Sequence, residues 1–186
     1  MAVQFRRRRF TVAQYHQITE AGLLREDDRV ELIDGEIVES TPIGRRHAAA
    51  VVRLTRACYE STGRRAVISP QNPVELDQYG EPQPDLLLLR PRADDYAGAQ
   101  PTAADVLLLV EVADSSLDYD RQVKLPMYAR ANIPEVWVED LVHDVVEVHR
   151  DPAPEGHRSV RLVRRGEAIR PSAFPDVEIP VDAILA

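Results

Sequence analysis

The chain has 186 residues, which corresponds to one domain with a sizeable single core. Hydrophobic residues make up 44% and charged residues 29%, a balance that argues against a disordered chain and is typical of a soluble globular protein. The longest apolar runs are far too short to span a bilayer, and no signal-peptide pattern opens the chain. The single cysteine, Cys58, cannot form an internal disulfide, so we expect a cytoplasmic protein. Because the apolar runs are short, we expect no membrane partner.

The formal net charge of −8 excludes a surface that attracts nucleic acid as a whole. Basic charge is concentrated near the N-terminus, where Arg6 to Arg9 are consecutive. We interpret residues 1–10 as a basic tail that either solubilises the protein or contacts phosphate. Residues 11–186 are expected to form a single domain.

The N-terminal half contains signals for two helices and a hairpin. Residues 11–22 fit a short helix capped by Thr11. Residues 29–40 fit two strands joined by Asp34-Gly35, a strong hairpin signal. Residues 44–63 fit a helix closed by Gly63. At about 100° per residue, the expected core face of this helix consists of Ala48, Val51, Val52, Thr55, Cys58 and Tyr59, opposite Arg46, Arg53 and Arg56.

The remaining elements alternate between short apolar strands and one helical segment. We expect strands over 66–69 (continuing through 73–76), 85–90 and 106–113, a helix over 116–133, a hairpin of 135–140 with 145–150, and edge strands over 157–165 and 174–185. Pro126 must open or kink the helix. The strands at 86–89 and 106–112 are apolar on both faces, so both faces of the sheet should be covered. The expected fold is a mixed α/β (α+β) sandwich around one sheet.

Two acidic residues flank the most apolar strands. If 85–90 and 106–113 pair antiparallel, with 85 opposite 111 and 90 opposite 106, Asp85 and Glu111 point to one face with Cβ atoms about 4.5–5.5 Å apart. Two like charges about 4 Å apart repel by about 4 kcal/mol at an effective dielectric of 20. A shared proton, a basic group or a cation would compensate. The alternative is that each acid ends a strand and faces water.

The residue types in this region favour a hard cation. Carboxylate oxygens without cysteine or clustered histidine favour Mg²⁺ or Mn²⁺ over zinc. Lys124, the only lysine in the chain, follows Glu111 by thirteen residues on a helix that should fold back over the sheet. Lysine and arginine are not interchangeable where a compact ammonium is needed, which favours a functional role. The alternative is an exposed helix lysine.

Several stretches together resemble a known family. The segments "ELIDGEIVES", "GRRHAAAVVRL", "QPDLLLL" and "LLLVEVADSSLDYDRQVKLPMYARANIPEVWVED" are similar to the bacterial Uma-two family of candidate restriction endonucleases in the PD-(D/E)XK nuclease superfamily. The similarity runs from about Thr11 to Arg150. It implies a restriction-endonuclease-like core, with a central mixed sheet flanked by helices and an extra N-terminal hairpin.

The resemblance also implies site residues. The "PD" of the motif corresponds to Pro84 and Asp85, and the second acid to Glu111. The lysine of the superfamily pattern should be residue 113, but this chain has Ala113. In the family the lysine lies on the next helix, so the resemblance assigns its role to Lys124. Asp85, Glu111 and the carbonyl of Val112 would then hold Mg²⁺ (or Mn²⁺).

Two further positions are candidates with open alternatives. His47 lies in the first turn of the 44–63 helix, where the family often has a histidine, and could contact phosphate, carry a proton or cap the helix. Glu31 and Glu36 share one face of the hairpin if its turn is type I′. Glu31 is either a third acid of the site or an exposed strand glutamate. The remaining histidines have no ligand spacing.

Three functional hypotheses follow. The first is a metal-dependent endonuclease that hydrolyses phosphodiester bonds of DNA, or less plausibly RNA. The second is a non-catalytic binding or assembly module of the nuclease fold that retains the acidic metal site, which Ala113 and the acidic surface favour. The third, a carboxylate-pair hydrolase acting on sugars, leaves Lys124 unexplained. By analogy with enzymes that act on two strands, we expect a homodimer.

Overall fold

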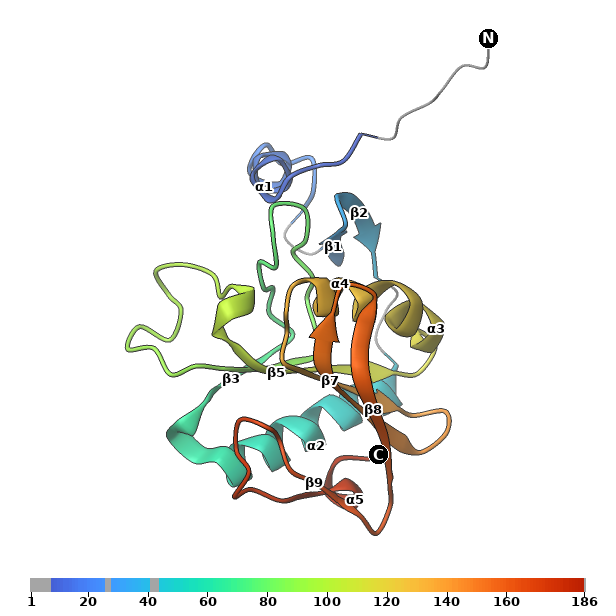
Figure 1. Ribbon diagram of the computed structural model, residues 1–186. Helices are drawn as coiled ribbons and strands as arrows, with labels where there is room; N and C mark the ends of the chain where they lie inside the picture. The colour runs from blue at the N-terminus through green and yellow to red at the C-terminus, as the bar shows by residue number, and fades with distance from the viewer. Residues whose placement is uncertain (1–7, 26–27, 41–43, 186) are drawn as a thin grey trace.

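The computed structural model describes residues 8–25, 28–40 and 44–185, and at its centre lies a six-stranded mixed sheet (Figure 1). The strand order is β3 (Val67–Pro70), β4 (Leu86–Leu89), β5 (Val106–Ala113), β6 (Glu135–Asp140), β7 (Val145–Ala153) and β8 (Gly156–Arg164). Neighbouring strands are antiparallel except for β5 and β6, which are parallel. A parallel pair needs a long crossover connection, and the helical segment 117–130 supplies it.

Helices cover both faces of this sheet, as Figure 1 shows. One face carries α2 (Arg45–Thr62) together with β9 (Ala168–Ile169), β10 (Ile179–Pro180) and α5 (Val181–Ile184), and the other carries α3 (Leu117–Tyr119), a π-helical turn (Asp120–Lys124) and α4 (Leu125–Arg130). The leucines of β4 alternate between the two sides. Leu86 and Leu88 pack in the core under α2, while Leu87 and Leu89 pack in the core under α4. The predicted coverage of both faces is confirmed.

The N-terminal elements form as their local signals predict. Thr11 caps α1 (Val12–Glu20) in a capping box with Gln14. β1 (Val30–Ile33) and β2 (Glu36–Glu39) form a hairpin whose two turn residues, Asp34 and Gly35, have φ values of 49° and 83°. Two left-handed residues make a type I′ turn. The backbone N–H of Phe10 donates to Gly35, which places the chain before α1 against this turn.

The pairing of β4 with β5 sets the relative position of the two acids. Leu86 lies opposite Val110, so the same register places Asp85 opposite Glu111, as predicted. At the other end a bulge between Leu88 and Leu89 brings Leu89 opposite Val106. The predicted pairing of residue 90 with 106 is therefore wrong by one residue, because the bulge takes up one position.

Two predicted strand assignments are also wrong. The strand beginning at 66 does not continue through 73–76, because Gln71 adopts a φ of 51° and turns the chain after β3. Segment 174–185 does not add an edge strand to the main sheet. β10 pairs only with β9, in a separate two-stranded sheet. The apolar side chains of segment 174–185, such as Ile179 and Ile184, pack instead into the core beneath α2.

The buried face of α2 is rotated from the predicted one. Its buried residues are Ala50, Val51, Leu54, Ala57, Cys58 and Thr62. Val52 and Tyr59, predicted as core, are 58% and 64% exposed. Helical periodicity indicates that α2 has an apolar face but does not determine which residue lies in the middle of that face. In the structure this residue is Leu54, the single leucine of the helix. No helix in the described ranges has the length and apolar character that crossing a membrane requires.

Candidate active site

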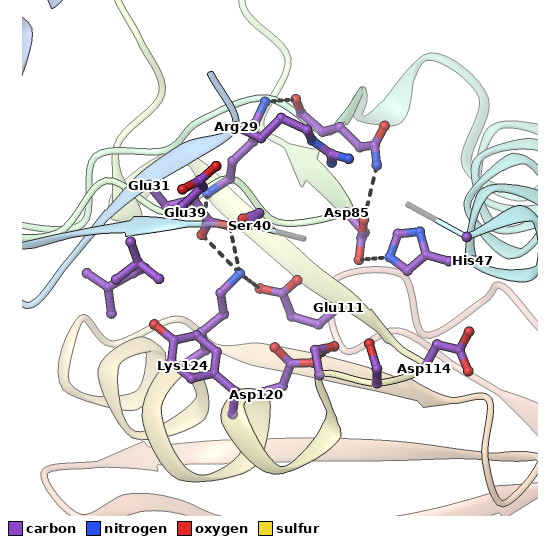
Figure 2. A pocket seen from close by; sticks show the side chains of 18 residues that line it. Arg29, Glu31, Glu39, Ser40, His47, Asp85, Glu111, Asp114, Asp120 and Lys124 are labelled. Atoms are coloured by element: carbon purple, nitrogen blue, oxygen red, sulfur yellow. Dashed lines mark hydrogen bonds and ion pairs between the residues drawn. The ribbon is translucent and has the colours of Figure 1, made fainter. Parts of the chain in front are cut away.

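A cleft of about 350 Å³ opens at the edge of the sheet where β4 begins and β5 ends. The hairpin β1–β2, the first turn of α2 and residues 115–124, which enter the crossover helix at Leu117, surround it (Figure 2). Its acidic lining residues are Glu31, Glu39, Asp85, Glu111, Asp114 and Asp120, and its basic ones are Arg29, His47 and Lys124. The sheet register and the crossover helix therefore bring all the sequence-predicted side chains to one place.

Asp85 is held by three donors from three separate segments. Its Oδ2 accepts hydrogen bonds from the backbone N–H of Val112 (2.9 Å) and from His47 Nε2 (3.0 Å). Its Oδ1 accepts a hydrogen bond from Gln71 Nε2 (3.2 Å). Because Asp85 is only 9% exposed, it does not simply end a strand in water. Its orientation is fixed relative to both β5 and α2.

His47 lies with its ring directed at Asp85 (Figure 2). Burial opposes its charged form, but the hydrogen bond that His47 donates to Asp85 and the negative charge of that carboxylate hold the pKa of His47 above its usual value. Gly44 is the N-cap of α2, and within the described part of the chain no side chain caps it. The alternative that His47 caps the helix is therefore wrong. Its Nδ1 is buried and has no hydrogen-bond partner among the described residues.

Lys124 forms ion pairs with both Glu111 and Glu31. Its Nζ lies 3.2 Å from Glu111 Oε1 and 3.0 Å from Glu31 Oε2. Lys124 is 6% exposed and Glu111 is 4% exposed, so the alternative of an exposed helix lysine is wrong. The hydroxyl of Tyr128 donates a short hydrogen bond to Glu111 Oε1 as well.

For both Glu111 and Lys124, burial and the charge of the other residue shift the pKa in opposite directions. Burial raises the pKa of Glu111 to about 8, and the neighbouring acids Asp120, Asp85 and Glu31 add to the effect, whereas Lys124 opposes it. Burial lowers the pKa of Lys124, but the carboxylates of Glu111, Glu31 and Asp120 outweigh it and raise that pKa well above its usual value. Lys124 therefore stays an ammonium ion in the folded protein.

Glu31 is part of the cleft and is not an exposed strand residue. It is 8% exposed and accepts hydrogen bonds from Ser40 Oγ (3.1 Å) and the backbone N–H of Gln83 (3.2 Å). The type I′ turn places Glu31 and Glu36 on one face, as predicted, but only Glu31 is buried. The alternative that Glu31 is an exposed strand glutamate is therefore wrong, because the hairpin folds over Lys124.

Asp120, Tyr128 and Gln71 lie beside the predicted site residues but were not predicted from the sequence. Asp120 is 3% exposed, accepts a hydrogen bond from Ser116 Oγ (2.7 Å), and has a pKa raised by burial. Asp120, Lys124 and Tyr128 are spaced four residues apart, and this helical spacing is a signal that could have identified both Asp120 and Tyr128. Gln71 reaches Asp85 from a left-handed turn, for which the sequence carries no recognisable signal.

The cleft contains carboxylate oxygens, which are the ligands that Mg²⁺ and Mn²⁺ prefer. In residues 8–25, 28–40 and 44–185 no three or more histidine, cysteine or acidic side chains are arranged to hold a metal ion. Mg²⁺ usually keeps several waters and uses one or two carboxylates together with substrate phosphates. Asp85 and Glu111 could supply those two carboxylates.

A solved structure with the same fold identifies the fold as nuclease-like. The crystal structure of a protein from Anabaena variabilis ATCC 29413, described as "a putative nuclease belonging to DUF820", superposes with a TM-score of 0.74. The match covers 94% of this chain and 97% of that chain at 14% sequence identity. A likeness at this identity shows the fold alone. The predicted nuclease-like fold, with a mixed sheet, flanking helices and an N-terminal hairpin, is confirmed.

The family follows from the sequence itself. The model of the Uma2 family, described as "Putative restriction endonuclease", matches residues 12–182. The chain therefore belongs to the Uma2 family, as its resemblance predicted. No curated protein matches the sequence.

Proposed function

We propose that the protein is a metal-dependent endonuclease that hydrolyses phosphodiester bonds of DNA. The observation that carries this proposal is the convergence of three side chains in one cleft: Asp85 directly before β4, Glu111 on β5 and Lys124 on the π-helical turn. Two carboxylates can hold a metal ion beside the ammonium ion, and these two cations would stabilise the negative charge that develops on oxygen during phosphoryl transfer. Membership of the Uma2 family supports a nucleic acid as the substrate.

The proposed metal ligands are Asp85, Glu111 and the carbonyl oxygen of Val112, with Mg²⁺ or Mn²⁺ as the ion. When bound, the ion supplies Lewis acidity and lowers the pKa of a coordinated water. The protein's own contribution is the fixed orientation of the ligands. Asp85 is held by Val112, His47 and Gln71, which leaves its carboxylate little freedom to rotate.

Lys124 acts as a cation and not as a base in this proposal. Since the surrounding carboxylates keep its pKa high, its ammonium group can donate hydrogen bonds to the attacking water or to the developing charge. Glu31 holds the other side of the ammonium group at 3.0 Å, so the hairpin fixes the position of Lys124 over Glu111. His47 orients Asp85 from α2 and presents a ring whose charged form Asp85 favours.

The cleft needs basic groups if it is to meet a phosphate backbone. Arg29 lines the cleft, and Arg45 and Arg46 begin the helix that carries His47. These arginines could offset the repulsion between phosphate and the acidic lining. Because such binding would depend on contacts between these arginines and phosphates, we expect it to weaken as salt increases.

One observation favours a second function, a non-catalytic module that binds metal or nucleic acid without turnover. Ala113 occupies the position of the superfamily lysine, and Lys124 is engaged by both Glu31 and Glu111. An ammonium ion so placed neutralises the acids and could serve structure alone. The two functions differ in turnover and in the effect of removing Lys124.

Cleavage of single- and double-stranded DNA at low salt, with Mg²⁺ or Mn²⁺ and with a chelator, tests the proposal. We expect cleavage by the wild type that the chelator abolishes, and its loss in Asp85→Ala and Lys124→Ala. Glu60→Ala, which removes an exposed acid of α2, is the control and should cleave as the wild type does. Equal cleavage by all variants would contradict the assigned site. No cleavage by any protein, with calorimetric Mn²⁺ binding lost only in Asp85→Ala, would favour the binding module.

A further inference from the structure

Tyr128 is a fully buried tyrosine whose hydroxyl group points into the candidate site. It is 0% exposed, and its ring packs in the apolar core under α4 with residues such as Leu109 and Ile133. Phenylalanine would fill the same volume in these surroundings. The hydroxyl group is therefore not required by packing, and burying it is costly unless it finds a hydrogen-bond partner.

The partner of this hydroxyl group is a single oxygen of Glu111. Tyr128 donates a short hydrogen bond to Oε1, and among the described residues the hydroxyl has no other hydrogen bond. Lys124 Nζ lies 3.2 Å from the same oxygen. Lys124 and Tyr128 are four residues apart at the start of α4, so both side chains project from one face of the helix toward β5.

The two donors distinguish the two oxygens of Glu111. Oε1 receives both the hydroxyl and the ammonium group, whereas no hydrogen bond from a described residue reaches Oε2. Glu111 itself lines the cleft. A carboxylate with two donors on one oxygen cannot rotate freely about its last torsion, so Oε2 is presented in a fixed direction.

We propose that Tyr128 is a positioning residue that, together with Lys124, fixes Glu111 through Oε1 and so reserves Oε2 for a divalent cation. This inference rests on the proposed function, because it takes Glu111 as a ligand of Mg²⁺ or Mn²⁺. Groups that hydrogen-bond a ligating carboxylate orient it, and removing them typically costs about 10- to 100-fold in metal affinity or activity. Tyr128 does not touch the reacting atoms in this arrangement and acts only through Glu111.

The test is Mn²⁺ binding by Tyr128→Phe, measured by calorimetry in the absence of DNA. We expect the dissociation constant to increase by about 10- to 100-fold relative to the wild type. Tyr96→Phe is the matched control, since it removes a phenol hydroxyl that donates to Arg90 O (2.8 Å) in a loop outside the cleft, and it should bind as the wild type does. Circular dichroism and thermal unfolding establish that Tyr128→Phe is folded.

A second measurement separates positioning from a purely structural role. In the cleavage assay, the Mn²⁺ concentration that gives half-maximal activity should rise in Tyr128→Phe, and saturating Mn²⁺ should restore most of the activity. A structural role would lower activity at every Mn²⁺ concentration alike and would overturn the inference. Unchanged or tighter Mn²⁺ binding by Tyr128→Phe would overturn it as well, while leaving the nuclease proposal intact.

Two remaining outcomes are also decisive. If the wild type binds no Mn²⁺, both this inference and the metal dependence of the proposed function are wrong. If Tyr128→Phe does not fold, the wild type labelled with ¹³C at tyrosine Cζ is titrated with Mg²⁺, and the signals are assigned by substituting the other tyrosines. The Tyr128 signal should then move as Mg²⁺ binds. Mg²⁺ binding without any shift of that signal would refute the inference.

Discussion

Glu139 on β6 is a buried acid whose removal should stabilise the protein in a pH-dependent way. Its side chain is 0% exposed, and neither carboxylate oxygen has a hydrogen-bond partner within the described residues. Burial raises the pKa of Glu139 to about 8, the negative charge of Asp85 adds to this, and Arg53 and Arg165 oppose it. We therefore predict that Glu139→Gln gains stability over the wild type as pH rises.

The direction of the pH effect on stability follows from the protonation state of Glu139 in the folded and in the unfolded chain. Below the ordinary value of 4.5, Glu139 is protonated in both the folded and the unfolded chain, so it has no pH-dependent effect. Between 4.5 and about 8 the unfolded chain releases the proton but the folded protein keeps it, so the free energy of unfolding falls as pH rises. Each pH unit is worth about 1.4 kcal/mol, so the loss by pH 7.5 reaches about 4 kcal/mol.

Urea unfolding of both proteins at about pH 4.5 and pH 7.5 measures this effect. The stability difference between Glu139→Gln and the wild type should grow by up to about 4 kcal/mol between these pH values. Glu60→Gln makes the same chemical change at an exposed position of α2, and its difference from the wild type should be independent of pH. A pH-independent difference for Glu139→Gln would refute the argument that Glu139 is buried as a neutral acid.

Further substitutions test other parts of the structure. Leu88→Ala should lower the free energy of unfolding, measured with urea, by about 2–5 kcal/mol, because Leu88 is fully buried under α2. A smaller effect than that of Leu162→Ala, at a half-exposed position, would contradict this packing. Thr11→Ala should cost about 1 kcal/mol in thermal unfolding, since it removes the cap of α1, and an unchanged midpoint would show that the cap contributes nothing. His47→Gln should lower DNA cleavage by about 10- to 100-fold, because it removes the ring that orients Asp85. Full activity of this variant would show that His47 is not needed to orient Asp85.

Local signals predicted the fold where one short stretch determines the outcome. Thr11 forms its capping box and Asp34-Gly35 forms its type I′ turn because the few residues involved supply all the required interactions. The four leucines of β4 predicted a strand buried on both faces for the same reason. The register of β4 with β5 was also predictable near the acids, because the lengths of the two apolar runs leave few alternatives.

Contacts between distant segments were not predictable in the same way. Glu31 lies 93 residues before Lys124, and only the packing of the hairpin over the crossover helix brings them together. The rotation of α2 depends on which side chains the sheet can accommodate, and the helix sequence alone does not determine it. The turn at Gln71 uses a left-handed conformation that a glutamine rarely adopts, so propensity argues against it.

The position of the lysine follows from how closely the crossover helix packs on β5. Residue 113 points to the same face as Glu111, but Ala113 is fully buried among Leu117 and Leu125 of the helix. A lysine at 113 would need the space that the helix occupies, so the ammonium group has to enter from the helix itself. Pro126 follows the π-helical turn and lies in the first turn of α4, where a residue that lacks an N–H is tolerated. On this argument the small side chain at 113 complements Lys124, and Ala113 alone is no evidence against the proposed nuclease activity.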